Sequence, residues 1–427
     1  MQIDENTKVA VIGLGYVGLP LAVALAKSFA TIGVDIKAER VRELEGGHDS
    51  THEIEDDKLQ ASTLRYSTDI ADAADADIFI VTVPTPVDKA NQPDLSPVRG
   101  ATRAIASVLK ARETAPIIIY ESTVYPGVTE DICGPLIEEV SGLKRGEHFL
   151  LGYSPERINP GDKVHTVDKI TRVVAGENDD VTAAMSALYG KVTSGGTFEA
   201  ASIKAAEAAK VIENAQRDIN IAFMNEIAQI FNKDGLSVYD VLDAARTKWN
   251  FLPFSPGLVG GHCIGVDPYY LSYKAQQLGH LPRVVLAGRS INDGMGGFVA
   301  DRVHDHLRRA SDVLVLGLTF KEHVPDLRNS KVVDVIDRLK WLGHEVTVHD
   351  PMADPDEAQD EYGLTLETGA LDAGRTYDAV VLAVPHQAYV DMDVAAVQAL
   401  VRDGGLVADL KGVWRDQDFG ETARWQL

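Results

Sequence analysis

The residue best suited to covalent chemistry in this sequence is Cys263, which ends the stretch GGHC at residues 260–263. A free thiol in a glycine-rich loop is more accessible to a reactant than a thiol in a helix core, so Cys263 is a candidate nucleophile. The alternative is a small packed residue. Asp267 follows four residues later. The other cysteine, Cys133, lies in VTEDICGPLIEEV, where the apolar pattern predicts an inert thiol on a buried helix face.

Four polar residues share one face of a predicted helix. They are separated by steps of three and four, which aligns them along one side of an α-helix: Glu207, Lys210, Asn214 and Arg217. Neighbouring alanines and Val211 indicate that this face is partly buried. A buried lysine requires a partner or a function, although charged surface helices often show the same spacing.

A glycine-rich turn, GLGYVG at residues 13–18, follows a predicted strand and opens a predicted helix. Glycines in this pattern let the backbone approach a pyrophosphate, whose charge the helix N-terminus stabilises. Asp35 ends the next predicted strand, where an acid can bind ribose hydroxyls and would repel a 2′-phosphate. The pattern favours NAD over NADP, although Arg40 nearby could accept such a phosphate. The alternative is a glycine turn without a ligand.

The second half of the sequence repeats the turn without its later glycines, as GLTFK at residues 317–321. A backbone cradle for pyrophosphate is therefore not expected there. Lys321, Asp326, Arg328 and Ser330 follow instead, and cationic side chains can bind phosphates where backbone amides cannot. The alternative is a solvated charge cluster.

Alternating apolar runs and helical segments must position these residues. The predicted buried strands are 9–13, 31–35, 77–84, 116–122 and 148–154 in the first half, and 312–317, 345–350, 378–385 and 406–412 in the second. Alanine-dense sequence with apolar residues at helical spacing predicts helices at 198–248, and a second helix is predicted at 284–309, although Gly294, Gly296 and Gly297 weaken it. We therefore expect an α/β fold, with two Rossmann-like doubly wound domains, related by a diverged duplication, and a helical region between them.

Composition excludes several classes. The 427 residues carry a formal net charge of −23, which argues against nucleic-acid and anionic-membrane partners. Two distant cysteines and the absence of a signal peptide predict a cytoplasmic protein. No metal is expected, because His262 beside Cys263 has no further ligands at metal spacing, and His262 is interpreted as a loop-shaping residue.

Taken together, these motifs resemble the UDP-glucose/GDP-mannose dehydrogenases over essentially the whole chain. The resemblance rests on VAVIGLGYVGLP with Asp35, VPTP (83–86), STVYPG (122–127), SPER (154–157), the Lys210 helix, GGHCIGVDPYYL (260–271) and FKEHVPDLRNS (320–330). The stretch TKWNFL (247–252) is similar to the branch that oxidises UDP-N-acetylhexosamines for surface polysaccharides.

The resemblance implies a two-step oxidation of a sugar C6 alcohol to a carboxylate with NAD. Asp267 and Lys210 would serve as the base through a water, and Cys263 would form a thiohemiacetal and then a thioester. Lys210 and Asn214 would stabilise the oxyanion. Glu156 and Thr123 would support hydrolysis of the thioester.

The resemblance also implies ligand contacts, domains and assembly. Cofactor contacts are expected from Gly13, Gly15, Tyr16, Val17, Gly18, Asp35, Arg40, Pro84, Thr85 and Thr123. Substrate contacts are expected from Glu156, Arg157, Lys204, Lys210, Asn214, Arg217, Arg246, Phe254, Gly257, Gly260, Lys321, Arg328 and, on the uridine side, Lys411. Arg246 would reach a neighbouring subunit, and residues 250–257 would fold over the sugar.

The expected domains are 1–198 for NAD, 199–305 for catalysis and dimerisation, and 306–427 for the UDP-sugar. The substrate is expected to be UDP-N-acetylglucosamine or UDP-N-acetylgalactosamine, in a homodimer formed through the central helices. The alternatives are a UDP-glucose or UDP-N-acetylmannosamine dehydrogenase and a non-catalytic nucleotide-sugar or NAD binding protein.

Overall fold

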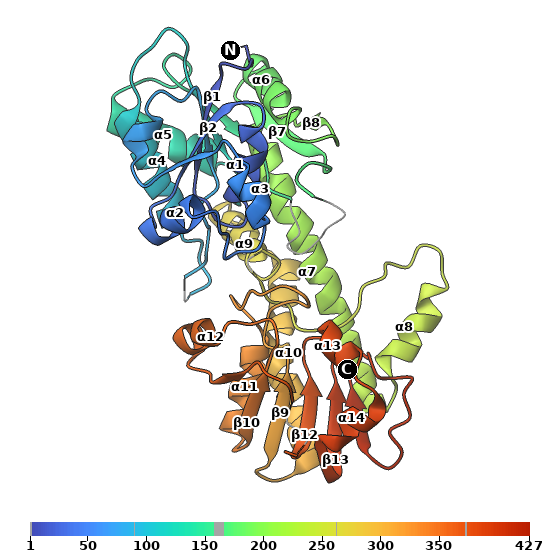
Figure 1. Cartoon of the computed structure of the whole chain (residues 1–427). Coiled ribbons are helices and arrows are strands. Elements are labelled where there is room, and N and C mark those ends of the chain that lie inside the picture. The colour runs from blue at the N-terminus through green and yellow to red at the C-terminus, as the bar shows by residue number, and fades with distance from the viewer. Residues whose placement is uncertain (1, 89, 158–165, 262, 372–373) are drawn as a thin grey trace. The chain divides into compact units, whose positions relative to one another are not determined.

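The computed structural model describes residues 2–88, 90–157, 166–261, 263–371 and 374–427. The chain divides into two compact units, and each contains one β-sheet (Figure 1). The first unit comprises Met1–Glu213 and Tyr269–His280, and the second comprises Asn214–Pro268 and Leu281–Leu427. The predicted α/β architecture is confirmed. His262, which was interpreted as a loop-shaping residue, lies outside the described residues.

The sheet of the first unit has the order β3-β2-β1-β4-β5-β6-β7-β8. Its pairs are parallel except for β6 with β7. The central strands are buried on both faces, as expected where helices cover a parallel sheet. The strands are β1 (Lys8–Ile12), β2 (Ala30–Val34), β3 (Arg65–Ser67), β4 (Ile78–Val81), β5 (Ile117–Tyr120), β6 (Leu150–Tyr153), β7 (Arg172–Gly176) and β8 (Thr197–Glu199).

The sheet of the second unit is parallel throughout, with the order β11-β10-β9-β12-β13-β14. Strand order reverses between β9 and β12, and ligands of doubly wound folds bind beyond the strand ends at such a point. The strands are β9 (Asp312–Leu316), β10 (Glu345–His349), β11 (Leu366–Glu367), β12 (Tyr377–Leu382), β13 (Val401–Asp409) and β14 (Ala423–Gln426).

Fourteen α-helices connect the strands within the described residues. The longest is α7 (Ile203–Asp234), and the others are α1 (Gly18–Ala26), α2 (Ala38–Glu45), α3 (Asp56–Gln60), α4 (Ser96–Val108), α5 (Gly134–Ser141), α6 (Asp179–Tyr189), α8 (Val238–Arg246), α9 (Asp267–Gln277), α10 (Arg283–Leu307), α11 (Val332–Trp341), α12 (Pro355–Tyr362), α13 (Gln387–Val390) and α14 (Val394–Ala399). None of the described helices is long and apolar enough to span a membrane.

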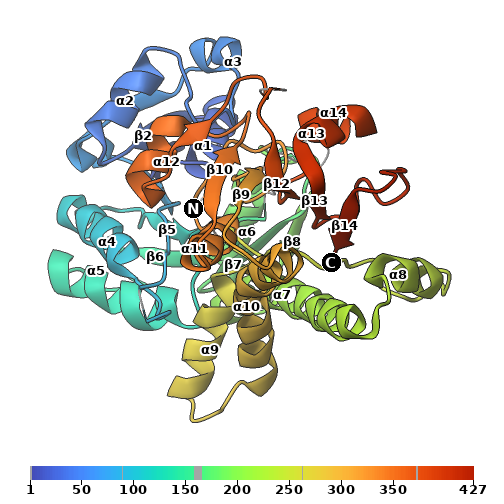
Figure 2. The same ribbon diagram turned by 90° about the horizontal axis from the view of Figure 1, so that it is seen from below.

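Helices α7 and α10 confirm the long helices predicted within 198–248 and at 284–309. They run side by side in the second unit (Figure 2), because Gly288 lets the backbones approach closely. A Cβ on Gly288 would lie 3.3 Å from the Ile219 side chain. Buried polar groups add to this contact: Arg289 donates to Asp218 (2.6 Å), and Asn225 donates to Asn292 (2.7 Å). The division of the chain into units falls within α7, between Glu213 and Asn214.

The predicted duplication is confirmed in the backbone of the two turns. Gly13 and Gly317 both have positive φ, at 98° and 92°, and each donates its N–H over 2.8 Å to the carbonyl at the end of the adjacent strand. The following residue donates its N–H to the next strand's acid, Asp35 in one unit (2.8 Å) and Asp350 in the other (2.6 Å). The copies differ after the turn, since α1 begins at Gly18 whereas α11 begins only at Val332.

A buried carboxylate fastens the start of α7 to the segment that follows β5. Glu207 is fully buried, and its two oxygens accept the N–H groups of Gly127 (2.6 Å) and Thr129 (2.9 Å). Burial raises the pKa of Glu207 from its ordinary value of 4.5 to about 7, because desolvation outweighs these two hydrogen bonds. Protonation of Glu207 therefore affects the stability of this unit near neutral pH.

We predict that Glu207→Gln removes a pH dependence of stability. A raised pKa in the folded state means that the contribution of Glu207 is full below about pH 4.5 and is lost as the pH rises through about 7. The loss is roughly 3 kcal/mol at most. Thermal melting at pH 5 and pH 8 should show the variant losing less stability than the wild type between these values. A constant difference between the two proteins would contradict the raised pKa.

Candidate active site

The glycine-rich turn of the first unit provides space where a dinucleotide would need it. A Cβ on Gly15 would meet no atom within 4 Å, whereas a Cβ on Gly18 would lie 1.8 Å from the Gly13 carbonyl oxygen. Gly18 is thus required by the protein itself. The protein itself does not require a glycine at position 15, and the missing side chain there leaves room for a ligand beside the N-terminus of α1. Tyr16 and Val17 are half-buried in the same turn.

Asp35 is positioned as an acceptor next to this turn. Its carboxylate receives the N–H groups of Leu14 (2.8 Å) and Lys37 (2.9 Å), and the side chain keeps lone pairs for further donors such as ribose hydroxyls. The next residue, Ile36, is 93% exposed, an apolar surface that no sequence motif marked. The residues present therefore fit a dinucleotide.

Arg40, expected as a cofactor contact, is engaged by protein groups. Its guanidinium donates to the Leu14 carbonyl (2.9 Å), Glu43 (2.9 Å) and the buried Asp49 (2.7 Å). These partners neutralise the charge that a 2′-phosphate would require, which strengthens the preference for NAD. Of the VPTP residues, Pro84 is exposed and Thr85 is half-buried in the segment after β4.

Two predicted catalytic residues of the first unit form a buried ion pair. The Lys210 ammonium lies 4.0 Å from a Glu156 carboxylate oxygen, and both side chains are almost fully buried. Lys210 is therefore the buried lysine that the helix pattern predicted. Thr123, half-buried, lies two residues after Glu121, which accepts a hydrogen bond from the buried Arg172 (2.9 Å).

The Cys263 segment of the second unit is joined to a polar pair by a backbone hydrogen bond. Cys263 forms no disulfide and is half-buried, and its carbonyl accepts the N–H of Asp267 (2.8 Å). Asn214 donates its amide N–H to the buried Asp267 carboxylate over 2.6 Å, while its amide oxygen accepts from Arg217 (3.2 Å). Asp267 is therefore oriented from the α7 helix that also carries Lys210. Cys133, by contrast, is fully buried, and burial raises its pKa to about 11, which confirms the prediction of an inert thiol.

A buried amide fixes the loop that precedes Cys263. Asn225 accepts the Gly257 N–H (2.8 Å) and donates to the Gly257 carbonyl (3.0 Å). A Cβ on Gly257 would lie 2.4 Å from the Lys411 ammonium, so the missing side chain makes room for that cation. Asn225 was not predicted from the sequence, because a single Asn on a helix belongs to no motif and looks like an ordinary surface residue.

The anion-binding candidates of the second unit lie on a loop braced against the thiol segment. Asn329 donates to the Gly261 carbonyl (3.0 Å), and Gly261 donates back to the Asn329 carbonyl (3.2 Å). A Cβ on Gly260 would lie 2.5 Å from the same Asn329 carbonyl. Lys321 is half-buried, and Arg328 donates two hydrogen bonds to buried Asp326. The fork of Arg328 is thereby oriented before any ligand arrives.

The remaining predicted substrate contacts make ion pairs and hydrogen bonds inside their own units. Lys204 pairs with Asp131 (3.0 Å), and Arg157 pairs with Glu213 (2.7 Å). Arg246 donates to Ser255 (2.6 Å) and to the carbonyl of the half-buried Phe254 (3.4 Å). Arg246 thus braces the segment 250–257 that was expected to fold over the sugar.

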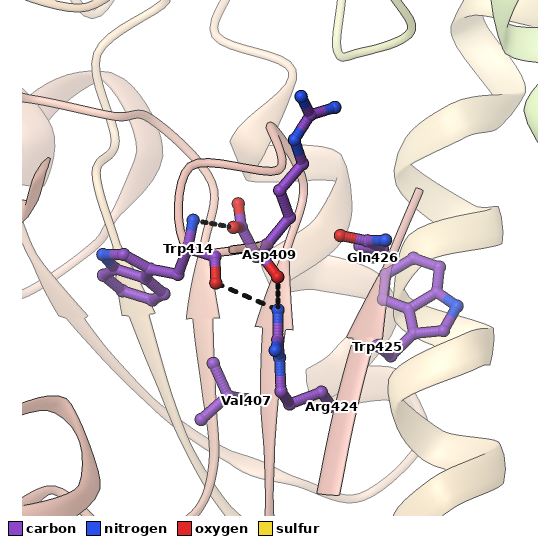
Figure 3. A pocket seen from close by; sticks show the side chains of 7 residues that line it. Val407, Asp409, Trp414, Arg424, Trp425 and Gln426 are labelled. Atoms are coloured by element: carbon purple, nitrogen blue, oxygen red, sulfur yellow. Dashed lines mark hydrogen bonds between the residues drawn. The ribbon is translucent and has the colours of Figure 1, made fainter. Parts of the chain in front are cut away.

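A pocket of about 260 Å³ lies at the β13–β14 edge of the second unit (Figure 3). Figure 3 shows Arg424 donating to the Trp414 carbonyl (3.0 Å) and the Trp414 N–H donating to Asp409 (2.7 Å). None of the residues that line this pocket is a predicted site residue: Val407, Asp409, Trp414, Arg415, Arg424, Trp425 and Gln426. Among the described residues, no group of three or more His, Cys, Asp or Glu could hold a metal ion.

Comparison with proteins of known sequence and structure tests the resemblance. Protein CapL of Staphylococcus aureus is 48% identical over 99% of this chain and 100% of its own length. A UDP-N-acetyl-D-glucosamine 6-dehydrogenase of Pseudomonas aeruginosa is 49% identical over 95% of this chain and 97% of its own. A solved UDP-D-ManNAc dehydrogenase from Pyrococcus horikoshii has a TM-score of 0.87 at 27% identity, and the match covers 98% of this chain and 99% of that one.

Three domain descriptions of one family match this sequence. The NAD binding domain matches residues 7–193, the central domain 204–294 and the UDP binding domain 314–416. Together with the relatives, they confirm the resemblance drawn from the motifs. The chain belongs to the UDP-glucose/GDP-mannose dehydrogenase family and is an NAD-dependent nucleotide-sugar 6-dehydrogenase.

Proposed function

We propose that the protein oxidises the C6 alcohol of UDP-N-acetylglucosamine or UDP-N-acetylgalactosamine to the uronate, as a precursor of a surface polysaccharide. The substrate class follows from the 49% identity to the Pseudomonas aeruginosa enzyme over nearly the whole chain. The observation that carries the chemistry is the 2.6 Å bond from Asn214 to Asp267, whose N–H donates to the Cys263 carbonyl over 2.8 Å. Two cysteines without a disulfide suit the reducing cytoplasm, where we place the enzyme.

The first oxidation requires a base for the hydroxyl proton. Asp267 is held as an acceptor by Asn214, and this suits it to receive that proton through a water. The Lys210 ammonium, 4.0 Å from a Glu156 oxygen, stabilises the developing alkoxide, because a buried cation interacts strongly with new negative charge. When bound, NAD⁺ supplies the hydride acceptor for both oxidations.

The second oxidation requires that the aldehyde carbon, which keeps its C–H bond, become tetrahedral and carry an oxyanion, so that a second hydride can leave. The Cys263 sulfur adds to the aldehyde as a thiolate and gives a thiohemiacetal, whose oxygen Lys210 and Asn214 stabilise. Hydride loss from this adduct leaves a thioester on Cys263. Glu156 takes a proton from water with the help of Thr123, and the water cleaves the thioester to release carboxylate and thiol.

Local cations bind the UDP part of the substrate. Lys321 and Arg328 supply positive charge after β9, and Lys411 lies against Gly257 in the same unit. Residues 250–257 form the wall over the sugar, held by Asn225 and Arg246. Asp35 would hold the ribose of the cofactor, and the exposed Ile36 beside it would offer an apolar surface to the adenine.

We also propose that a second copy of the chain covers α7. Ile212, Phe223 and Ile230 are 53%, 53% and 52% exposed at helical spacing along one face of α7, an apolar stripe typical of an interface. This stripe supports the expected homodimer.

The substrate assignment is tested by NADH yield. We expect two NADH per UDP-N-acetylhexosamine and slower turnover of UDP-glucose and UDP-N-acetylmannosamine across a panel. One NADH with free aldehyde would overturn the thioester mechanism, and no NADH from any sugar would indicate a binding protein.

Cys263→Ser should abolish uronate formation, because a hydroxyl is a far weaker nucleophile than a thiolate. Cys133→Ala, which removes the other thiol, should still form uronate.

A pair of glycine substitutions separates cofactor binding from folding. Gly18→Ala should lower the melting temperature by several degrees, because its Cβ would clash with the Gly13 carbonyl at a cost of about 2 kcal/mol. Gly15→Ala should melt like the wild type without ligand, yet raise the KM for NAD at least about tenfold by blocking the pyrophosphate. An unchanged KM in Gly15→Ala would contradict the proposed cofactor position.

Light scattering tests the dimer. We expect twice the chain mass of 46.2 kDa for the wild type and a shift towards the monomer for Phe223→Asp, which puts a charge into the apolar stripe. Trp341→Asp on α11, a residue that is 73% exposed, is the control and should leave the mass unchanged. A monomeric wild type would refute the interface.

A further inference from the structure

A buried histidine lies at the point where strand order reverses in the second unit. His386 follows β12 and is 1% exposed, and β12 lies beside β9, whose carboxyl end leads into the loop 317–331. That loop carries Lys321 and Arg328, the cations proposed to bind the UDP part of the substrate. His386 belongs to no motif of the sequence analysis, and no step of the proposed chemistry uses it.

The neighbours of His386 specify which ring nitrogen carries the proton. The backbone N–H of His323 donates to His386 Nδ1 (3.2 Å), so Nδ1 is an acceptor and the proton is on Nε2. Nε2 lies 3.0 Å from an Asp350 oxygen and 3.0 Å from the Thr319 hydroxyl. The Thr319 hydroxyl gives its own proton to the Lys321 carbonyl (3.0 Å) and therefore accepts from His386.

Asp350, the carboxylate that accepts from His386, is held rigidly by the backbone around it. Asp350 is fully buried and accepts the N–H groups of Leu318 (2.6 Å), Thr319 (3.0 Å), Met352 (2.7 Å) and Ala353 (3.2 Å). Burial opposes its charge, but these bonds and the one from His386 hold the pKa of Asp350 at about 2. The Asp350 carboxylate thus fixes the imidazole of His386, and the imidazole in turn holds the loop through the N–H of His323.

The loop requires such an anchor because its backbone is strained. His323 has a φ of 62°, in the left-handed region that non-glycine residues rarely adopt. Its side chain is exposed, so the N–H bond to His386 and the ring contact at 6.1 Å are what the described structure shows holding it. His323 lies two residues after Lys321 and five before Arg328. A change at His323 would therefore displace both cations.

We propose that His386 is a positioning residue for UDP-sugar binding: its Nδ1 holds the strained backbone at His323 and so places Lys321 and Arg328 for the diphosphate. The inference rests on the proposed function of those two cations. It assigns His386 no contact with the substrate. It also predicts that the two ring nitrogens have separable roles, since only Nδ1 contacts the loop backbone at His323.

Two substitutions separate the nitrogens. In His386→Asn the amide oxygen can replace Nδ1 and accept from His323, while in His386→Gln the amide nitrogen can replace Nε2 and donate to Asp350. We expect His386→Gln to raise the KM for the UDP-sugar at least about fivefold, the value of one lost hydrogen bond. His386→Asn keeps the bond from His323 but loses the one to Asp350, so its KM should rise clearly less than that of His386→Gln. The KM for NAD, which binds the other unit, should not change in either variant.

Calorimetric titration with UDP alone provides a readout that does not depend on turnover. Weaker UDP binding by His386→Gln than by His386→Asn supports the proposal, even if the wild type oxidises none of the sugars offered. Equal affinities of both variants for UDP would overturn it. A parallel rise of the KM for NAD and for the UDP-sugar would also overturn it, because it would show a general loss of structure rather than a displaced loop.

Discussion

A net charge of −23 opposes the approach of the anionic ligands of this family, so local positive groups must hold them. The two units meet this constraint in different ways. In the first, α1 begins directly at Gly18 and aims its N-terminal N–H groups at the turn. In the second, the next helix after Gly317 begins only at Val332, and we propose that the side chains of Lys321, Arg328 and Lys411 supply the charge instead. The rest of the site follows from keeping these groups in place.

Backbone polar groups in the loops of the site are satisfied by side chains. Such loops cannot use helix or sheet partners, and an unpaired buried N–H is costly. Glu207 accepts from Gly127 and Thr129, and Asn225 pairs with both polar groups of Gly257. Asn329, which is exposed, binds Gly261 with one side-chain bond, from its amide to the Gly261 carbonyl, and with its own backbone carbonyl, which accepts the Gly261 N–H. In each case a glycine gives a close approach, and a side chain distant in sequence fixes it.

Sequence alone predicted nine of the fourteen strands in the described residues and the long helices, because apolar periodicity is a local signal. The strands β3, β7, β8, β11 and β14 were missed. RYS in β3 and TFE in β8, at the edges of their sheet, are partly exposed and lack an apolar run. Asn225 and His386 were missed for another reason. Their roles depend on contacts with Gly257 and His323, 32 and 63 residues away, and no spacing along the chain reveals them.

The duplicated acids show how one position came to serve two purposes. Asp35 and Asp350 accept the same N–H from the turn before them, so the fold needs a carboxylate at both places. Asp35 accepts only two backbone N–H groups and is partly exposed, so it retains lone pairs for a ribose. Asp350 accepts four N–H groups and faces His386, and it is fully buried. A carboxylate with its acceptors filled cannot bind a ribose, so in the second unit this acid serves as the anchor of the loop that carries Lys321 and Arg328, the cations that we propose for the phosphates.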